Sequence, residues 1–207
     1  MPASISPASL AHQDTKQAHQ STCSSKPYYH VSSYAKDGQN YFLNQKPLQR
    51  YIDKIETLSV DNYSQFIYAC NTIPAAIQQD TGIRKSKWLC ELIFESVRKE
   101  YFYQAPRRMH SIYLCSSLEE ARVFNENFRE NKASVFEAIF DGTVHQFNMK
   151  LFTIAEEYLF DNITAPSETI YQQLRTYACE YWSQKHPMEQ IEYIYEGTVK
   201  LRLVLDQ

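Results

Sequence analysis

Glycine is scarce in this sequence, with only 4 Gly among 207 residues. The glycine-rich loops that cradle phosphates, GxGxxG and GxxxxGK[ST], are therefore missing, because each needs several closely spaced glycines. Their absence excludes the common glycine-based dinucleotide and nucleoside-triphosphate sites. A nucleotide, if one is bound, must be held by side chains.

Paired cysteines and a basic surplus are missing as well. The 5 Cys stand singly, without CxxC spacing. This pattern argues against a disulfide framework and a structural zinc site, and it predicts reduced thiols in a cytosol-like compartment. A formal net charge of −3 disfavours a dedicated nucleic-acid binder, which normally carries an excess of Lys and Arg.

Long apolar runs are the third absence. No run approaches the roughly 18 residues that span a bilayer, and the N-terminus lacks the apolar region of a secretory signal. We therefore expect a cytoplasmic protein with no membrane partner. Residues 1–26 hold only Ile5 and Leu10 as large aliphatic residues, too few to offset the entropy of ordering, so we predict a disordered tail. Such a tail is compatible with a linker, and also with the uncleaved export leader of a bacterial toxin or effector that is injected into a host cytosol.

Aromatic residues are abundant by contrast, with 16 Tyr and 11 Phe. Tyrosine is common in ligand pockets because it offers both a stacking face and a hydroxyl. The hydrophobic fraction of 43% is sufficient for a core. We therefore predict one domain over residues 27–207.

Apolar periodicity predicts an α+β fold, with a mostly antiparallel sheet and flanking helices. Residues 150–160 have a mixed pattern. Ser117 is expected to cap a helix that turns Leu118, Ala121, Phe124 and Phe128 inward, and Asp141-Gly142 to form a hairpin-type turn. The expected strands are 28–33, 110–115, 133–140 and 199–205. One helix is expected to start at Pro47 and another at Ser117. Three further helical stretches are expected at 60–80, with a break at Pro74, at 84–103 and at 167–184.

Four stretches, in this order along the chain, carry a resemblance. A histidine-bearing strand and turn are followed by an aromatic strand that enters a helix, then a further strand, then an acid-bearing strand near the end. The stretches are "YYHVSSYAKDGQ" (28–39), "IYLCSSLEEARVF" (112–124), "VFEAIFDGTV" (135–144) and "QIEYIYEGTVKLRLV" (190–204). The chain resembles the ADP-ribosyltransferase superfamily in its His–Tyr–acid branch. It is similar to the rifampin-modifying transferases and to a bacterial domain family of that fold group.

This resemblance implies a split, mostly antiparallel fold that binds NAD as co-substrate without a glycine-rich loop. It implies transfer of ADP-ribose to an acceptor, which could be a protein, a nucleic acid or a small molecule. By resemblance His30 bonds a ribose hydroxyl with Ser32 beside it, Tyr113 stacks on nicotinamide, and Glu192 is the catalytic acid with Gln190 two residues before it on the same strand face. A carboxylate suits this chemistry because breaking the nicotinamide bond builds an oxocarbenium-like ribose.

The chain also departs from the family pattern. Val31 replaces the glycine that follows the motif histidine, and we expect it to narrow the groove. The loop where the rifampin-type enzymes carry their acid reads His-Gln-Phe-Asn at 145–148, without a carboxylate. The assignment of Glu192 therefore follows other branches, and Glu189 and Glu196 are alternative acids.

"PRRMH", residues 106–110, is the remaining cluster. It is either a solvated loop or a pair of arginines, Arg107 and Arg108, that grips a pyrophosphate. The second interpretation also supports a runner-up in the same fold group, an RNA 2′-phosphotransferase. A catalytically silent domain that serves as an interaction module is the alternative from another class. No structural metal is expected in any of these cases.

Overall fold

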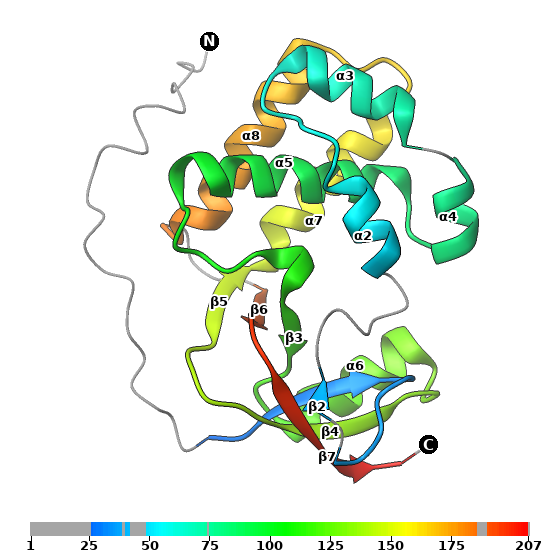
Figure 1. Cartoon of the computed structure of the whole chain (residues 1–207), viewed down its shortest axis with the longest axis vertical. Helices are drawn as coiled ribbons and strands as arrows, with labels where there is room; N and C mark the ends of the chain where they lie inside the picture. Colours follow the sequence, from blue (N-terminus) through cyan, green and yellow to red (C-terminus); the bar gives the residue numbers. More distant parts are fainter. Residues whose placement is uncertain (1–25, 39, 42–48, 74, 186–189, 207) are drawn as a thin grey trace. The chain divides into compact units, whose positions relative to one another are not determined.

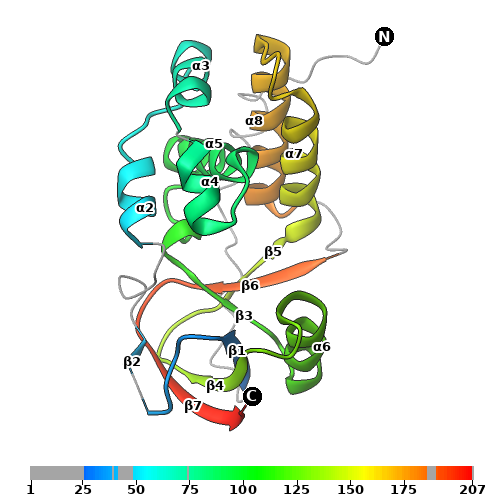
Figure 2. The same cartoon turned by 90° about the vertical axis from the view of Figure 1, so that its right-hand side faces the viewer.

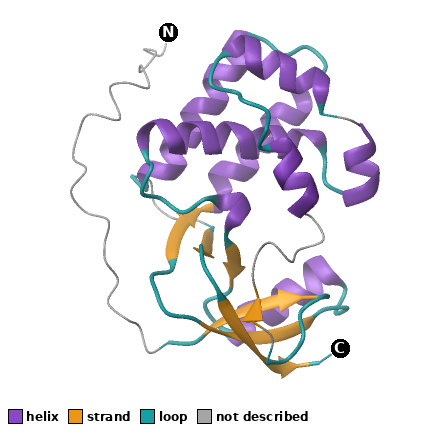
Figure 3. Cartoon of the chain, in the orientation of Figure 1, coloured by secondary structure: helices purple, strands orange, loops and turns teal. Residues whose placement is uncertain are grey.

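The structure is a computed structural model that describes residues 26–206 except 39, 42–48, 74 and 186–189. Several predicted features lie outside the described residues: all of the 1–26 tail except Lys26, and the positions Pro47, Leu48, Pro74 and Glu189. The described residues fall into two compact units. One is built from helices and the other holds most of the strands (Figure 3).

The helical unit comprises residues 48–109 and 147–191 (Figure 1). A 3-10 turn, η2 (Arg108–His110), begins at the end of its first segment. Its helices are α2 (Gln49–Ile55), α3 (Tyr63–Thr72), α4 (Ala75–Thr81), α5 (Lys85–Tyr101), α7 (Met149–Asn162) and α8 (Glu168–Ser183).

Helix α5 is the centre of this unit. Leu89, Ile93 and Val97 repeat at i, i+4 and i+8, and all three are fully buried, as the sequence predicted. On the same helix, the ring of Phe94 lies 5.0 Å from that of Phe152 on α7 in an edge-to-face arrangement. The apolar stripe therefore packs against a neighbouring helix in the geometry that aromatic rings prefer.

Helices α7 and α8 were predicted with different success. Helix α8 begins as expected, with the Ser167 hydroxyl accepting a hydrogen bond from the Ile170 N–H. The mixed pattern assigned to 150–160 is wrong, because α7 runs through it from the N-cap Asn148. Glu156 lies among the buried residues of α7, so a charged residue interrupts the apolar stripe and hides the helical period.

The sheet unit comprises the described residues up to Tyr41, residues 110–146, and residues 192–206 (Figure 2). The division between the two units falls between Gln146 and Phe147, within β5, and between Ile191 and Glu192, after the first residue of β6. The elements are β1 (Tyr28–Ser32), β2 (Asn40–Tyr41), β3 (Ile112–Leu114), α6 (Leu118–Arg129), β4 (Ser134–Ile139), β5 (His145–Asn148), β6 (Ile191–Tyr195) and β7 (Val199–Leu205).

Two small sheets form, in the orders β1-β4-β7-β2 and β3-β6-β5. The pairs β1/β4, β4/β7, β2/β7 and β3/β6 are all antiparallel. The fold is α+β, as predicted. Asp141-Gly142 does not close a hairpin, however, because β4 and β5 belong to different sheets. Residues 145–148, expected as a loop, are the strand β5.

The main core of the sheet unit gathers buried side chains from both sheets, and a smaller cluster lies where α6 packs on sheet residues. Along the predicted strand 199–205, which is β7, Val199 and Leu201 are both fully buried, whereas Leu203 is 36% exposed. The main cluster is Ile112, Leu114, Phe136, Ala138, Tyr195, Val199 and Leu201, and the smaller one is Val31, Ala121, Ala133 and Val135.

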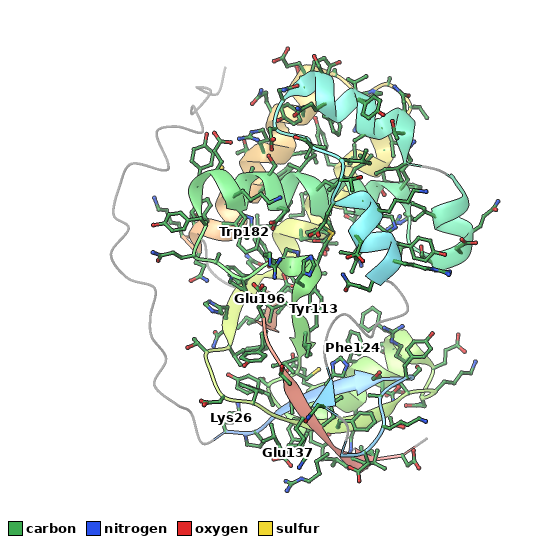
Figure 4. The ribbon with its side chains drawn as sticks, in the orientation of Figure 1. Lys26, Tyr113, Phe124, Glu137, Trp182 and Glu196 are labelled. Atoms are coloured by element: carbon green, nitrogen blue, oxygen red, sulfur yellow. The ribbon has the colours of Figure 1, made fainter. Side chains whose placement is uncertain are left out.

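Helix α6 turns Leu118 and Ala121 inward as predicted, but not Phe124 and Phe128. Its buried residues are Ala121 and Asn125, whereas Phe124 (Figure 4) is 37% and Phe128 69% exposed. The Asn125 amide explains the difference, because it donates to the Ala133 carbonyl and accepts from the Ala133 N–H. A polar side chain can be buried when its hydrogen bonds are made, and burying Asn125 rotates the two phenylalanines outward.

The turn after β1 is present as predicted. Gly38 has φ +69°, which glycine adopts without a steric penalty. Its N–H donates to the Leu201 carbonyl at 2.9 Å. The Asp37 carboxylate accepts from the Leu203 N–H at 2.7 Å. These two bonds fasten the turn to β7.

Candidate functional site

Strands β1 and β3 meet at one point. Tyr29 and Cys115 exchange both backbone hydrogen bonds, at 2.9 and 2.7 Å, as an isolated bridge. A continued antiparallel ladder would next pair Val31 with Tyr113. The described residues show no such pair. Instead, Nδ1 of His30 lies 3.0 Å from the Tyr113 carbonyl oxygen.

Tyr113 and Glu192 lie on one face of the β3-β6-β5 sheet. Tyr113 is directly opposite Ile194 in the β3/β6 register, and Glu192 is two residues from Ile194. Side chains alternate along a strand, so Glu192 shares the face of Ile194 and Tyr113 as a diagonal neighbour, with a typical spacing of about 7 Å. The Tyr113 side chain is 38% exposed, whereas Glu192 is 8% exposed.

The structure therefore brings together the three residues that the sequence selected as catalytic. His30 on β1 is half-buried and bonded to the main chain of Tyr113. Tyr113 on β3 is partly exposed, and Glu192 on β6 supplies a largely enclosed carboxylate. An imidazole, a stacking ring and a carboxylate can together orient a nucleoside and stabilise positive charge on its sugar.

The residues around His30 differ from their predicted roles. Ser32 is 8% exposed, and its hydroxyl oxygen accepts from the N–H groups of Tyr34 and Ala35. Ser32 therefore closes the turn after β1, and its hydroxyl is not open to a cofactor. Val31 belongs to the cluster beneath α6, so its side chain points to the opposite strand face from His30. The prediction that Val31 narrows the groove beside His30 is therefore wrong.

The other predicted residues near the acid are more exposed. Gln190 precedes β6 instead of lying on it; its side chain is exposed and its carbonyl accepts from the Met149 N–H at 2.7 Å. Glu196 is exposed directly after β6. Burial lowers the pKa of His145, and the negative charge of Glu196 acts in the opposite direction.

Arg108 is the clearest correction. It is 3% exposed, with Nε and Nη2 bonded to Glu91 at 3.1 and 3.3 Å and Nη1 donating to the Tyr181 hydroxyl at 2.6 Å. Its guanidinium also lies 4.1 Å from the centre of the Phe152 ring. Arg108 is an interior residue of the helical unit, neither solvated nor open to a pyrophosphate. The sequence held one sign that an arginine would be buried here: Glu91 lies inside an apolar helix, and a buried acid needs a partner.

The thiols of the four described cysteines are not candidate nucleophiles. Burial raises the pKa of Cys115 to about 12 and those of Cys70 and Cys179 to about 11. It also raises the pKa of the fully enclosed Cys90 well above its ordinary value. The thiolate is the nucleophilic form, so these cysteines remain protonated and inert.

A small cavity of about 140 Å³ lies in the helical unit, between residues 56–61 and one face of α5. Its acids already have partners within the chain. Asp61 accepts from Ser59 and Ser96, and Glu95 forms a two-point ion pair with Arg98. The cavity therefore resembles a polar crevice more than a binding site.

The described residues contain no group of three or more His, Cys, Asp or Glu placed to hold a metal ion. Within the same part of the chain, none of the helices has the length and apolar character needed to cross a membrane.

No curated protein is significantly similar to the chain. Residues 15–207 match the model of a family described as a protein of unknown function, DUF2441. The match covers far more than half of the chain and includes β1, β3 and β6, the three strands of the candidate site. The chain therefore belongs to the DUF2441 family.

Proposed function

We propose that this chain is an NAD-dependent ADP-ribosyltransferase that transfers ADP-ribose to a protein, a nucleic acid or a small molecule. One observation carries the proposal. His30, Tyr113 and Glu192, which are far apart in sequence, meet on β1, β3 and β6 of one compact unit. These are the residue types, in the same order, that the resemblance to the His–Tyr–acid branch requires.

The exposed ring of Tyr113 suits nicotinamide, since aromatic–base stacking needs an accessible ring face. His30 reaches the same place from β1 through its bond to the Tyr113 main chain and would hold a ribose hydroxyl. The end of the β1/β3 pairing after the Tyr29–Cys115 bridge also supports the proposal. Beyond that bridge the His30 side chain, and not a backbone group of β1, bonds the Tyr113 carbonyl. A ligand could then approach without breaking strand pairing.

Glu192 would stabilise the reacting sugar. Cleavage of the bond between nicotinamide and ribose places positive charge on the ribose ring, and a nearby carboxylate opposes that charge. At 8% exposure the carboxylate lies in a low-dielectric environment, where charge–charge attraction is stronger than in water. Its contribution would be largest in the transition state, when the sugar is most positive.

The RNA 2′-phosphotransferase alternative loses its main support, because Arg108 is enclosed in the helical unit. The interaction-module alternative keeps one observation in its favour. Glu192 is so enclosed that the same arrangement could serve packing alone. The experiment below separates this alternative from catalysis.

The test combines NAD calorimetry with an assay of nicotinamide release in the presence of cell extract as the acceptor source. Glu192→Gln keeps the shape and removes the charge, so we expect nearly unchanged NAD affinity and a turnover lower by about a hundredfold. Glu196→Gln is the matched control on an exposed acid and should retain turnover. A wild type that binds NAD but never releases nicotinamide supports the interaction module. Loss of turnover only in Glu196→Gln would reassign the acid.

A further inference from the structure

Two of the four glycines directly follow an aspartate, at Asp37-Gly38 and Asp141-Gly142. Such a pair can modify itself. The glycine nitrogen attacks the side-chain carbon Cγ of the aspartate and forms a five-membered succinimide ring, which water then opens. Glycine favours this attack because it carries no Cβ to obstruct it. The sequence does not distinguish the two pairs, whereas the structure does.

The Asp37-Gly38 pair is held by hydrogen bonds on both reacting groups. The Gly38 N–H donates to the Leu201 carbonyl at 2.9 Å. The Asp37 carboxylate accepts from the Leu203 N–H at 2.7 Å. Both groups are therefore fastened to β7, and these bonds must break before the nitrogen can reach Cγ.

The Asp141-Gly142 pair lies in the connection from β4 to β5 (Figure 1), and both residues are exposed. Among the described residues, no hydrogen bond holds the Asp141 carboxylate or the Gly142 N–H. The main-chain carbonyl of Asp141, by contrast, accepts from the Tyr195 hydroxyl at 2.8 Å. A Cβ at Gly142 would lie 3.0 Å from Cε2 of Tyr195, so the glycine also allows this ring to approach.

We propose that Asp141-Gly142 is a site of spontaneous isoaspartate formation, assisted by the Tyr195 hydroxyl. This inference is independent of the proposed function. In the first step the Gly142 nitrogen bonds to Asp141 Cγ. One carboxyl oxygen leaves Cγ as water, with the amide proton and a proton from solvent.

In the second step water adds to the main-chain carbonyl carbon of Asp141, and the bond from that carbon to the Gly142 nitrogen breaks. The added water returns one proton to the nitrogen and one to solvent. The chain then runs through Cγ, and the α-carboxylate is free. The first step releases one water and the second consumes one, so the product is an isomer and no other reactant is needed.

The Tyr195 hydroxyl contacts the oxygen that becomes more negative in both steps. Loss of the amide proton places charge on the Asp141 carbonyl oxygen, because nitrogen and oxygen of an amide share their electrons. Addition of water turns the same oxygen into an oxyanion, which a directed donor stabilises. Burial and the negative charge of Asp141 raise the pKa of Tyr195, so its hydroxyl keeps the proton that it donates.

The first test is ageing of the full chain at neutral pH, followed by peptide mapping with electron-transfer fragmentation, which distinguishes isoaspartate from aspartate. In the native protein we expect isoaspartate to form at Asp141 at least about tenfold faster than at Asp37, the size of one hydrogen bond that must break. In urea the two sites should react at similar rates, because only the fold distinguishes them. Equal native rates, faster reaction at Asp37 or no isoaspartate at Asp141 would overturn the proposal.

Two substitutions test the assignment of atoms. Tyr195→Phe removes the hydroxyl but keeps the ring, whose centre lies 4.5 Å from that of Phe140. We expect a folded variant, by near-ultraviolet circular dichroism, that forms isoaspartate at Asp141 about tenfold more slowly. An unchanged or faster rate would contradict the assisting role.

Asp141→Glu supplies a side chain that would need a six-membered ring, and it should abolish the modification. A carboxyl methyltransferase that recognises the isoaspartyl α-carboxylate, with labelled S-adenosylmethionine as methyl donor, counts the modified sites independently of the mapping. Aged wild type should take up label and aged Asp141→Glu should take up far less. Equal labelling of the two proteins would place the modification elsewhere and overturn the assignment to Asp141.

Discussion

The two units differ in how much charge they bury. In the helical unit the buried carboxylates are paired with arginines or hydroxyls of the same unit. Glu91 meets Arg108, Glu95 meets Arg98, and Glu156 accepts from both Arg84 and Ser86. In the sheet unit the ion pair Glu137–Arg202 lies at the surface. Among the described residues of that unit, Glu192 is the buried carboxylate.

This contrast teaches how to separate structural from functional charge. A buried arginine with its donors directed at carboxylates and hydroxyls of its own helices, such as Arg108, stabilises the fold. His30, Tyr113 and Glu192 lie instead where a strand ladder stops, and one of them is exposed. Burial of a charged residue alone does not identify a functional site. Whether the residue lies where the backbone pairing of two strands ends is more informative.

The strongest test of the comparison removes Arg108. Arg108→Ala leaves Glu91 buried without its partner, and we expect the free energy of unfolding to fall by about 3–5 kcal/mol. The double variant Glu91→Leu/Arg108→Met removes both charges and should lose much less. Urea denaturation measures both. A small loss in Arg108→Ala would place this arginine in solvent and reopen its role as a cofactor ligand.

Packing around Tyr195 tests whether the sheet unit depends on aromatic contacts as the helical unit depends on ion pairs. A Cβ at Gly197 would lie 2.7 Å from the Tyr195 hydroxyl oxygen, on a backbone with φ +156°. We expect Gly197→Ala to destabilise the protein by about 2–3 kcal/mol. Gly38→Ala, at φ +69° in the left-handed region and with open space around the Cβ, should cost about 1 kcal/mol. Equal melting temperatures for the two variants would remove the clash as the cause.

Tyr113 sharpens the functional side of the comparison. Tyr113→Ala should weaken NAD binding by about 1–3 kcal/mol through lost stacking, and Tyr113→Phe by much less, because the ring face makes the contact. Tyr103→Ala in the helical unit is a suitable control, since this side chain is 72% exposed, and it should leave the affinity unchanged. Calorimetry gives all three values. Equal losses in Tyr113→Ala and Tyr113→Phe would indicate a role for the hydroxyl and contradict stacking.

The smallest expected effect concerns Asp61 of the helical unit. Hydrogen bonds from Ser59 and then Ser96 lower the pKa of its carboxyl below the ordinary 3.8. A lowered pKa means that the stabilisation is complete above about pH 4 and is lost as pH falls through the folded-state value. Ser96→Ala should therefore cost about 1 kcal/mol at pH 7, and the difference from wild type should shrink near pH 3. A pH-independent difference would assign the effect to packing.

Strong periodic patterns were sufficient to predict much of the fold. The stripe Leu89, Ile93 and Val97 gave α5, and the cap Ser167 gave α8. Where the pattern contained a buried polar residue, prediction failed: Glu156 concealed α7, and the burial of Asn125 left Phe124 and Phe128 of α6 exposed. Glu156 pairs with Arg84 and Ser86 on distant elements, and Asn125 pairs with Ala133 beyond the end of α6. No pattern within either helix therefore identifies the two residues as interior.

The candidate site was predictable as a set of residues but not as a geometry. The order of His30, Tyr113 and Glu192 followed from motif resemblance. The bond between His30 and the Tyr113 carbonyl depends on where the β1/β3 ladder stops, which is a tertiary property. Arg108 was misassigned because adjacent arginines resemble an anion site in sequence, while the decisive acid, Glu91, lies on another element.

The turn after β1 has a further consequence for the behaviour of the protein in concentrated solution. Backbone donors and acceptors on the edge of a sheet are a template for strand pairing between molecules. Beyond its short pairing with β2, the outer edge of β7 meets Gly38, which bonds the Leu201 carbonyl, and Asp37, whose carboxylate accepts from the Leu203 N–H. The turn thereby occupies hydrogen-bonding groups that a second chain would need. Two residues that look like ordinary turn formers thus also protect the sheet against aggregation.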